Sequence, residues 1–213
     1  MVEVFVAENS VPLSTQQLGF LSEYLPREMI ERAGKFRRWQ DSQAYLLSKF
    51  LLAEGIKDCG FTEHALEKMQ YTEYGRPYLS PDFDFNISHS GKHIVCAISK
   101  LYKVGIDVEE IHPIDLADFA NQFTEHELSR IKNATNQNAE FFRYWTIKEA
   151  VIKADGRGLS LPLTNVFIDI HAHVEGAQWH FYKIDIDPGY MAHLAVNTLL
   201  PKPVVLKRIP MPV

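Results

Sequence analysis

The chain has 213 residues, of which 46% are hydrophobic and 23% charged, a balance typical of a globular protein that buries one large or two small cores. Its formal net charge of -5 argues against a nucleic-acid-binding surface, because such surfaces carry an excess of Lys and Arg. The sequence has no apolar run near the ~20 residues of a membrane span and no basic, apolar leader, so neither nucleic acid nor a membrane is expected as a partner.

The first half of the chain predicts a strand, two helices and a hairpin, in that order. Hydrophobic residues over 2–7 predict the strand, and helical periodicity predicts helices over 14–33 and 37–55, the second ending at Gly55. Farther along, two strand-like runs flank a polar turn that begins after Ile87. The turn offers donors that suit phosphate oxygens, although ordinary hairpins close with similar residues: Ser88, His89, Ser90 and Lys92.

The second half repeats this order of elements. Its predicted strand, helices and strand-like runs lie at 104–111, at 115–133 and 138–155, and at 164–174, 178–186 and 190–199. The repetition predicts an α+β fold of two similar α/β halves, 1–102 and 103–213. The proline-punctuated tail from residue 201 either pairs as an edge strand or packs along the surface. Three tryptophans are expected in the core: Trp39, Trp145 and Trp179.

The predicted strand over 104–111 alternates apolar and acidic residues. If Ile106 faces the core, Asp107 and Glu109 point the other way, roughly 6.6 Å apart along the strand. Two bare carboxylates at that distance repel each other by roughly 2–3 kcal/mol at an effective dielectric constant of ~20. A hard cation such as Mg²⁺ would remove this repulsion, whereas acids at a solvated strand edge would need no ion.

The predicted helix over 138–155 has two distinct faces and a stop signal. An apolar stripe recurs at helical spacing: Tyr144, Ile147, Val151 and Ala154. Glu149 and Lys153, four residues apart, share the opposite face. Gly156 can supply the left-handed cap. An exposed Glu-Lys pair of this kind would contribute only ~0.3–0.5 kcal/mol, so by itself it indicates no site.

Three segments together carry a family resemblance: FNISHSG at 85–91, GIDVE at 105–109 and WTIKEAVIK at 145–153. In this order and spacing they resemble the signature of 4′-phosphopantetheinyl transferases, most closely the longer type that activates surfactin synthetase. Such enzymes move phosphopantetheine from coenzyme A to a serine of an apo acyl or peptidyl carrier protein and release 3′,5′-ADP. The resemblance implies a pseudo-twofold axis, an active site in the cleft between the halves, and a Mg²⁺ (or Mn²⁺) cofactor; a monomer is expected.

The resemblance also assigns site residues. The family's metal-binding acids match three positions: Asp107, Glu109 and Glu149. Lys153 matches a catalytic lysine that would stabilise the departing 3′,5′-ADP or donate a proton to it. Contacts to coenzyme A are implied for five residues: Arg76, Ser88, His89, Lys148 and Lys153. For Arg76 the expected contact is the adenine or the 3′-phosphate, and for Lys148 a solvated surface position is the alternative.

The attacking serine belongs to the carrier protein, so the enzyme needs a general base. Alignment on Phe123 favours Glu127 as the catalytic base, with Glu125 as the alternative. The same stretch is also a helix-capping pattern, in which Thr124 caps the helix and Glu127 returns the hydrogen bond. One glutamate could not easily do both, so base and capping box are competing interpretations of Glu127.

One departure from the family pattern lies in the first-half helix. The family has an arginine before a pair of leucines, where it grips the 3′-phosphate, and this chain has Ala44 or Tyr45 there. Lys35, Arg37 and Arg38, one to two turns upstream, are candidates to compensate. Without compensation, a charge-assisted contact worth ~1.5–3 kcal/mol would be missing.

Two other function classes compete with a carrier-protein transferase. A coenzyme A-binding relative that has lost turnover would act as a regulatory module, and Ala44 leaves this alternative open. An unrelated metal-dependent pyrophosphatase or nuclease could use the carboxylates but would not need the Ser-His-Ser-Gly turn. The expected location is cytoplasmic, because Cys59 and Cys96 stand in apolar contexts typical of reduced core cysteines.

Overall fold

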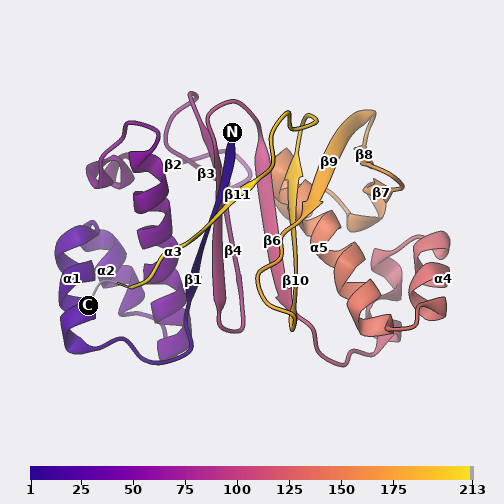
Figure 1. Ribbon diagram of the computed structural model, residues 1–213, viewed down its shortest axis with the longest axis horizontal. Helices are drawn as coiled ribbons and strands as arrows, with labels where there is room; N and C mark the ends of the chain where they lie inside the picture. Colours follow the sequence, from indigo (N-terminus) through magenta and orange to yellow (C-terminus); the bar gives the residue numbers. More distant parts are fainter. Residues whose placement is uncertain (212–213) are drawn as a thin grey trace.

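The computed structural model describes residues 1–211, which form two β-sheets packed face to face between two layers of helices (Figure 1). The first sheet has the order β11-β1-β5-β4, with β1 Val2–Glu8, β4 Asp84–Ser90, β5 His93–Ser99 and β11 Val205–Arg208. The second has the order β6-β10-β9-β8-β7, with β6 Val104–Glu110, β7 Phe167–Ile168, β8 Ala172–Val174, β9 Ala177–Lys183 and β10 Tyr190–Val196. A short hairpin pairs β2 Gln70–Tyr71 with β3 Pro77–Tyr78.

Helices cover the outer face of each sheet. α3 Trp39–Lys57 packs on β5 and β1, and α5 Gln137–Asp155 packs on β6 and β10. Other α-helices are α1 Thr15–Tyr24, α2 Arg27–Ala33 and α4 Glu125–Asn133. The 3₁₀ helices are η1 Glu63–Lys68, η2 Leu116–Gln122, η3 Gly158–Ser160 and η4 Leu163–Asn165. Across the described residues, none of the helices combines the length and apolar character that crossing a membrane requires.

Alternation along the strands explains these layers. In β1, Val4 lies in the core between the two sheets, whereas Phe5 lies in the core shared with the helices of the first half. In β6, Ile106 likewise lies in the core between the sheets, as predicted. Asp107, the next residue, therefore stands on the other face of the strand, the face that α5 covers.

The predicted α+β fold of two similar halves is confirmed by the topology. The strand order β1-β5-β4 of the first half is repeated by β6-β10-β9 of the second. In each half a helix of 19 residues, α3 or α5, packs on the corresponding pair of strands. These helices lie on opposite sides of the molecule in Figure 1, as a pseudo-twofold relation requires.

Several predicted element boundaries are wrong. The helix predicted over 14–33 is divided into α1 and α2, because Pro26 forces the preceding residue out of helical geometry. α3 continues past Gly55, where a Cβ would come within 2.2 Å of Ile98, so this glycine allows close packing and does not end the helix. The segment 115–133 forms η2 and then α4, and 164–174 forms η4 and the hairpin of β7 and β8.

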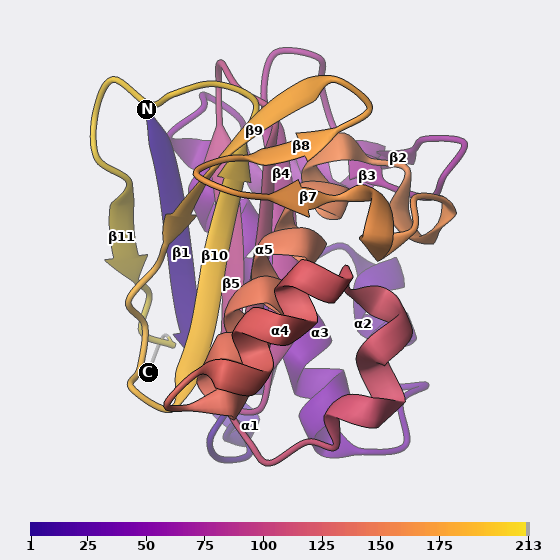
Figure 2. The ribbon, with the colours of Figure 1, turned by 90° about the vertical axis from the view of Figure 1, so that its right-hand side faces the viewer.

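The C-terminal tail returns to the first sheet. β11 pairs in parallel with β1, with Glu3 opposite Val205 and Val6 opposite Arg208. Figure 2 shows β11 beside β1 at the edge of the molecule. The edge-strand alternative is therefore confirmed for these residues, and the last strand of the C-terminal half belongs in space to the N-terminal sheet. Residues 212 and 213 lie outside the described part of the chain.

Side chains join the two halves where β4 lies beside β6. Alternate residues of β4 accept hydrogen bonds from backbone N–H groups of β6, each 20 positions later. The bonds run to Asp84 from Val104 (2.9 Å), to Asn86 from Ile106 (2.9 Å), to Ser88 from Val108 (3.4 Å) and to Ser90 from Glu110 (3.1 Å). Residues with a period of two share one face of a strand, so these hydrogen bonds hold the segment 85–91 against the segment 105–109.

Candidate active site

Asp107 lies at the meeting point of the three sequence motifs. Asp107 is only 2% exposed, and its Oδ1 accepts hydrogen bonds from Ser88 Oγ (2.8 Å) and Lys153 Nζ (2.6 Å). Lys153 Nζ also donates to Ser88 Oγ (3.0 Å). These contacts connect β4, β6 and α5 at one carboxylate.

The second oxygen of Asp107 is unsatisfied. Among the described residues, Oδ2 is buried and has no hydrogen-bond partner. A buried carboxylate oxygen without a partner loses its hydrogen bonds to water and gains none from the protein. This lowers the stability of the folded state by about 1–3 kcal/mol, or more for a charged group. Such an oxygen can accept a hydrogen bond from water or from a substrate, or it can bind a cation.

The negative charge of Asp107 also acts on two other carboxylates, those of Glu109 and Glu149. Burial raises the pKa of Glu109, and the negative charge of Asp107 raises it further. The pKa of Glu149 is raised by the same two causes in the same order. Ser90 Oγ donates to Glu109 Oε2 (2.7 Å) and orients that side chain. The contribution of Asp107 to both shifts indicates that the three acids lie close enough for their negative charges to interact.

A hard divalent cation fits this group of acids. Oxygen ligands, concentrated negative charge and an orphaned carboxylate oxygen are what Mg²⁺ and Mn²⁺ favour. The side chains are not arranged as a finished cage, because within residues 1–211 no group of three or more His, Cys, Asp or Glu side chains has metal-binding geometry. In the structure, the ammonium of Lys153 supplies the nearest positive charge to Asp107.

The close approach of α5 to β6 depends on Gly105. A Cβ at this position would lie 2.0 Å from the carbonyl oxygen of Ala150 and 2.4 Å from the backbone nitrogen of Ala154. No side chain fits against helix backbone at these distances, so glycine lets the helix lie directly on the strand. α5 then ends at Gly156, whose φ of 94° is the predicted left-handed cap.

His89 lines a cavity of about 530 Å³ at the N-terminal end of α3. Ala44 and Arg38 line the same cavity, and Arg38 occupies the N-cap position of α3. Burial and the positive charge of Lys153 lower the pKa of His89. Trp39 also lines this cavity and is 41% exposed, so its predicted place in the core is wrong.

Glu127 and Lys148 form an ion pair in the interior. Lys148 Nζ lies 2.8 Å from Glu127 Oε2, and the side chains are 0% and 2% exposed. Lys148 also donates to the carbonyl oxygen of Leu163 (3.0 Å), and burial lowers its pKa. This placement corrects the expectation that Lys148 is either a coenzyme A contact or a surface lysine, because a substrate cannot reach a side chain this deeply buried.

The capping interpretation of Glu127 is confirmed. The backbone N–H of Thr124 donates to Glu127 Oε2 (2.8 Å), and the N–H of Glu127 donates to Thr124 Oγ1 (3.3 Å). The same carboxylate therefore serves the capping box and the ion pair with Lys148. These contacts do not support Glu127 as the base for a carrier serine, whereas Glu125, two residues earlier in α4, is exposed.

Arg76 is held by protein atoms on three sides. Its side chain is 12% exposed and pairs with Asp84 at 2.7 Å. It also donates to backbone carbonyl oxygens of β6 and α5. The guanidinium expected to contact coenzyme A is thus occupied within the protein.

Sequence reasoning gave no structural role to four residues that shape the site: Asp84, Asn86, Ser90, which it named only as a possible phosphate donor, and Gly105. The signal for the first three is their period-two spacing with Ser88, which places them on one face of β4. What they face depends on how the halves pack, and this could not be derived from the pattern alone.

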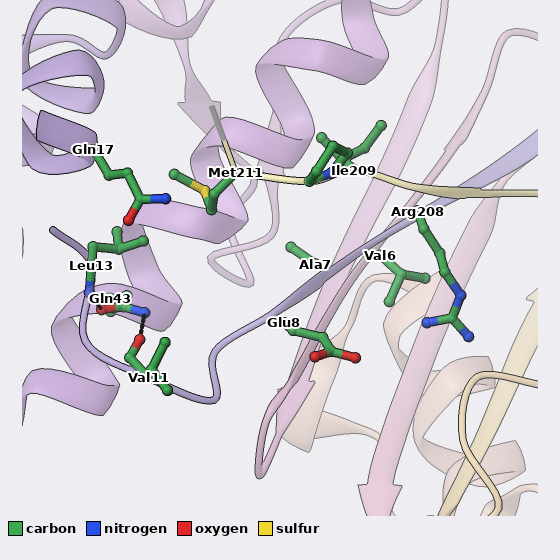
Figure 3. Close-up of a pocket in the computed structure, with 11 residues that line it drawn as sticks. Val6, Ala7, Glu8, Val11, Leu13, Gln17, Gln43, Arg208, Ile209 and Met211 are labelled. Atoms are coloured by element: carbon green, nitrogen blue, oxygen red, sulfur yellow. Dashed lines mark hydrogen bonds between the residues drawn. The ribbon is translucent and has the colours of Figure 1, made fainter. Parts of the chain in front are cut away.

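A second cavity, of about 380 Å³, lies between β1, the segment before α1 and the C-terminal tail (Figure 3). Its lining is largely apolar and includes Val6, Leu13 and Met211. Glu8 and Arg208 add charged groups at one side. It lies at the β11 side of the first sheet, three strands away from β4 and the acids.

Comparisons with known proteins place both halves of the chain. The family described as the 4′-phosphopantetheinyl transferase superfamily matches residues 103–197, and the one described as 4′-phosphopantetheinyl transferase, N-terminal, matches residues 12–101. Two transferases from Bacillus subtilis, ffp and Sfp (strain 168), are 31% and 30% identical over 208 residues, covering 92% of each chain. The transferase gsp of Aneurinibacillus migulanus is 32% identical over 171 residues, covering 79% of this chain and 72% of its own.

Proposed function

We propose that this chain, which belongs to the 4′-phosphopantetheinyl transferase family, transfers the 4′-phosphopantetheine group of coenzyme A to a serine of an apo carrier protein. The observation that carries the proposal is the contact of Ser88 and Lys153 with Asp107, which unites the three family motifs at one buried carboxylate. The carrier is an acyl or peptidyl carrier protein, and the second product is 3′,5′-ADP. The enzyme is proposed to act as a monomer in the cytoplasm.

Asp107, Glu109 and Glu149 are the residues that would hold a Mg²⁺ or Mn²⁺ ion. When bound, this ion supplies charge neutralisation for the pyrophosphate of coenzyme A. Lys153 is proposed to stabilise the leaving phosphate or to protonate it, and the position of its Nζ beside Ser88 and Asp107 supports this role. Phosphoryl transfer depends mainly on such positioning and charge stabilisation.

Ser88 and His89 are proposed to bind phosphate oxygens of coenzyme A. His89 opens into the cavity that Arg38 also lines, so Arg38 is the upstream cation that the structure favours as the substitute for the family arginine at Ala44. Two acids are candidates for the base that accepts the serine proton. Glu125 is exposed at the start of α4, and Glu109 is half-buried with a raised pKa.

The test is a mass measurement on the carrier protein. The purified enzyme, coenzyme A and Mg²⁺ should convert an apo carrier to its holo form, and replacing the carrier's acceptor serine by alanine should abolish the mass increase. Release of 3′,5′-ADP without carrier modification would indicate a hydrolase. Coenzyme A binding with no turnover on any acyl or peptidyl carrier would indicate a regulatory relative.

His89→Ala should raise the KM for coenzyme A by about 10-fold and change kcat less, because a charge-assisted contact to ground-state phosphate contributes about 1.5 kcal/mol or more. The effect should be larger near pH 5.5 than near pH 8. The pKa of His89 is lowered in the free protein, and the imidazolium formed at low pH is the form that attracts phosphate. Steady-state kinetics at both pH values would measure this.

The matched control for His89→Ala is His64→Ala, at an exposed histidine paired with Glu67. Its KM should equal that of the wild type at both pH values. With dephospho-coenzyme A as the substrate, the rise in KM caused by His89→Ala should be smaller if His89 contacts the 3′-phosphate. An unchanged KM for coenzyme A in His89→Ala would mean that the end of β4 belongs to an ordinary hairpin without a phosphate site.

A further inference from the structure

We propose that Arg76 is a positioning residue that fixes the two acid-bearing elements, β6 and α5, relative to each other, and that it is not a ligand of coenzyme A. The proposal rests on the transferase activity proposed above. β6 carries Asp107 and α5 carries Glu149 and Lys153, so the geometry of the site depends on the separation of these two elements.

The first set of contacts secures the end of α5. Arg76 Nη1 donates to the carbonyl oxygens of Lys153 (2.6 Å) and Ala154 (2.7 Å). Carbonyls of the last helical turn lack partners within the helix, and here the guanidinium supplies them. Gly156 lies directly against this side chain, because a Cβ there would come within 3.2 Å of Arg76 Cδ.

The second set of contacts secures the start of β6. Arg76 Nη2 donates to the carbonyl oxygen of Val104 (2.9 Å), and Asp84 Oδ2 accepts from the N–H of Val104 (2.9 Å). Arg76 and Asp84 are themselves paired through both carboxylate oxygens, at 2.8 and 2.7 Å. Together the two side chains satisfy both backbone groups of Val104, as a neighbouring strand would.

These contacts use the hydrogen-bonding capacity that a phosphate would need. Six acceptor atoms on α5, β4 and β6 share the four terminal N–H groups of the guanidinium, which leaves only Nε–H for any other partner. An arginine recognises phosphate through paired, parallel N–H groups. The planar, forked guanidinium can instead reach three elements at once, which a lysine ammonium cannot do with the same geometry.

The proposal predicts a loss in kcat with the affinity for coenzyme A preserved. In Arg76→Ala, displacement of α5 from β6 by about 1 Å should lower kcat by about 10²-fold. The KM for coenzyme A should stay within about twofold of the wild-type value. Arg76→Lys should recover less than about a tenth of the lost kcat, since one ammonium cannot bridge both elements. All rates should be measured below the melting temperature of each variant.

Hydrogen exchange provides a measurement that does not depend on activity. The N–H of Gly156 donates to the carbonyl oxygen of Ile152 (3.0 Å), and its exchange should accelerate in Arg76→Ala as the last turn of α5 frays. The matched control is Arg208→Ala, because Arg208 also donates to a backbone carbonyl but stands on β11, at the far edge of the first sheet (Figure 3). Both exchange at Gly156 and kcat should be unaffected in the control.

Three results would overturn the proposal. A rise of about tenfold or more in the KM for coenzyme A at unchanged kcat would make Arg76 a substrate ligand. Unchanged kcat in folded Arg76→Ala would reduce its role to stability. Unchanged exchange at Gly156 would show that α5 does not depend on the contact. If the wild type modifies no carrier, the proposed function fails, and hydrogen exchange alone still decides whether Arg76 holds α5.

Discussion

Asp107→Asn should reduce kcat for carrier modification by at least about 10²–10³-fold, the loss that follows removal of one group that stabilises transition-state charge. Asp107 is the acid that contacts both Ser88 and Lys153, and its buried Oδ2 has no hydrogen-bond partner among the described residues. Asparagine keeps the size of the side chain but lacks the charge that a divalent cation requires. Carrier mass spectrometry over a range of Mg²⁺ concentrations would measure the loss.

The matched control is Glu110→Gln, at an exposed acid three positions along the same strand. This variant should retain wild-type activity. Mg²⁺ should raise the melting temperature of the wild type and of Glu110→Gln but not that of Asp107→Asn, because an ion that binds only the folded state stabilises it. Wild-type activity in Asp107→Asn at millimolar Mg²⁺ would disprove the metal assignment.

The pH dependence of stability in Glu149→Gln also tests the assignment of Glu149 to a metal-binding group. The folded-state pKa of Glu149 is raised by burial and by Asp107, so without metal the folded protein holds this proton more tightly than the unfolded chain does. Stability should then fall as the pH rises from the ordinary glutamate range through the raised pKa. Glutamine removes this loss, so in EDTA Glu149→Gln should melt at or above the wild-type temperature at pH 8, with a smaller difference at pH 4.5.

The elements that bear the acids could be predicted from the sequence because each has a strong local pattern. The alternation of apolar and acidic residues around Ile106 predicts β6, and the apolar stripe that ends at Gly156 predicts α5. The contact between Asp107 and Lys153 was predictable only through the family resemblance, since strand and helix meet by tertiary packing. The glycine that permits this packing, Gly105, has no local signature at all.

The role of Glu127 shows where a resemblance and a local rule disagree. The resemblance indicated a base, whereas the Thr-x-x-Glu spacing indicated a capping box, and the structure has the capping box. The local rule succeeded because all its atoms lie within four residues. The partnership with Lys148 could not be seen in either pattern, because it depends on how α4 packs against α5.

Glu127→Gln should lower the free energy of unfolding by about 3–5 kcal/mol, the usual cost of leaving one member of a buried ion pair without its counter-charge. Glutamine can still return the hydrogen bond of the capping box, so the loss isolates the pairing with Lys148. The deficit should shrink at high pH. Burial lowers the pKa of Lys148, so the unfolded chain binds that proton more tightly, and stability rises with pH as the buried amine becomes neutral.

The double variant Glu127→Gln/Lys148→Met separates the structural role of Glu127 from a catalytic one. Methionine removes the unpaired charge while filling similar volume, so most of the lost stability should return, because an apolar replacement of a buried ion pair is often neutral or better. If Glu127 is structural, kcat of this folded variant should lie within about threefold of the wild type, whereas loss of a true general base would cost about 10²–10⁴-fold. Glu125→Gln is the surface control and should change the unfolding free energy by no more than about 1 kcal/mol, the scale of a charge near a helix N-terminus. A stable double variant with kcat reduced by that larger factor would restore Glu127 as the base and would mean that the buried pair opens during turnover.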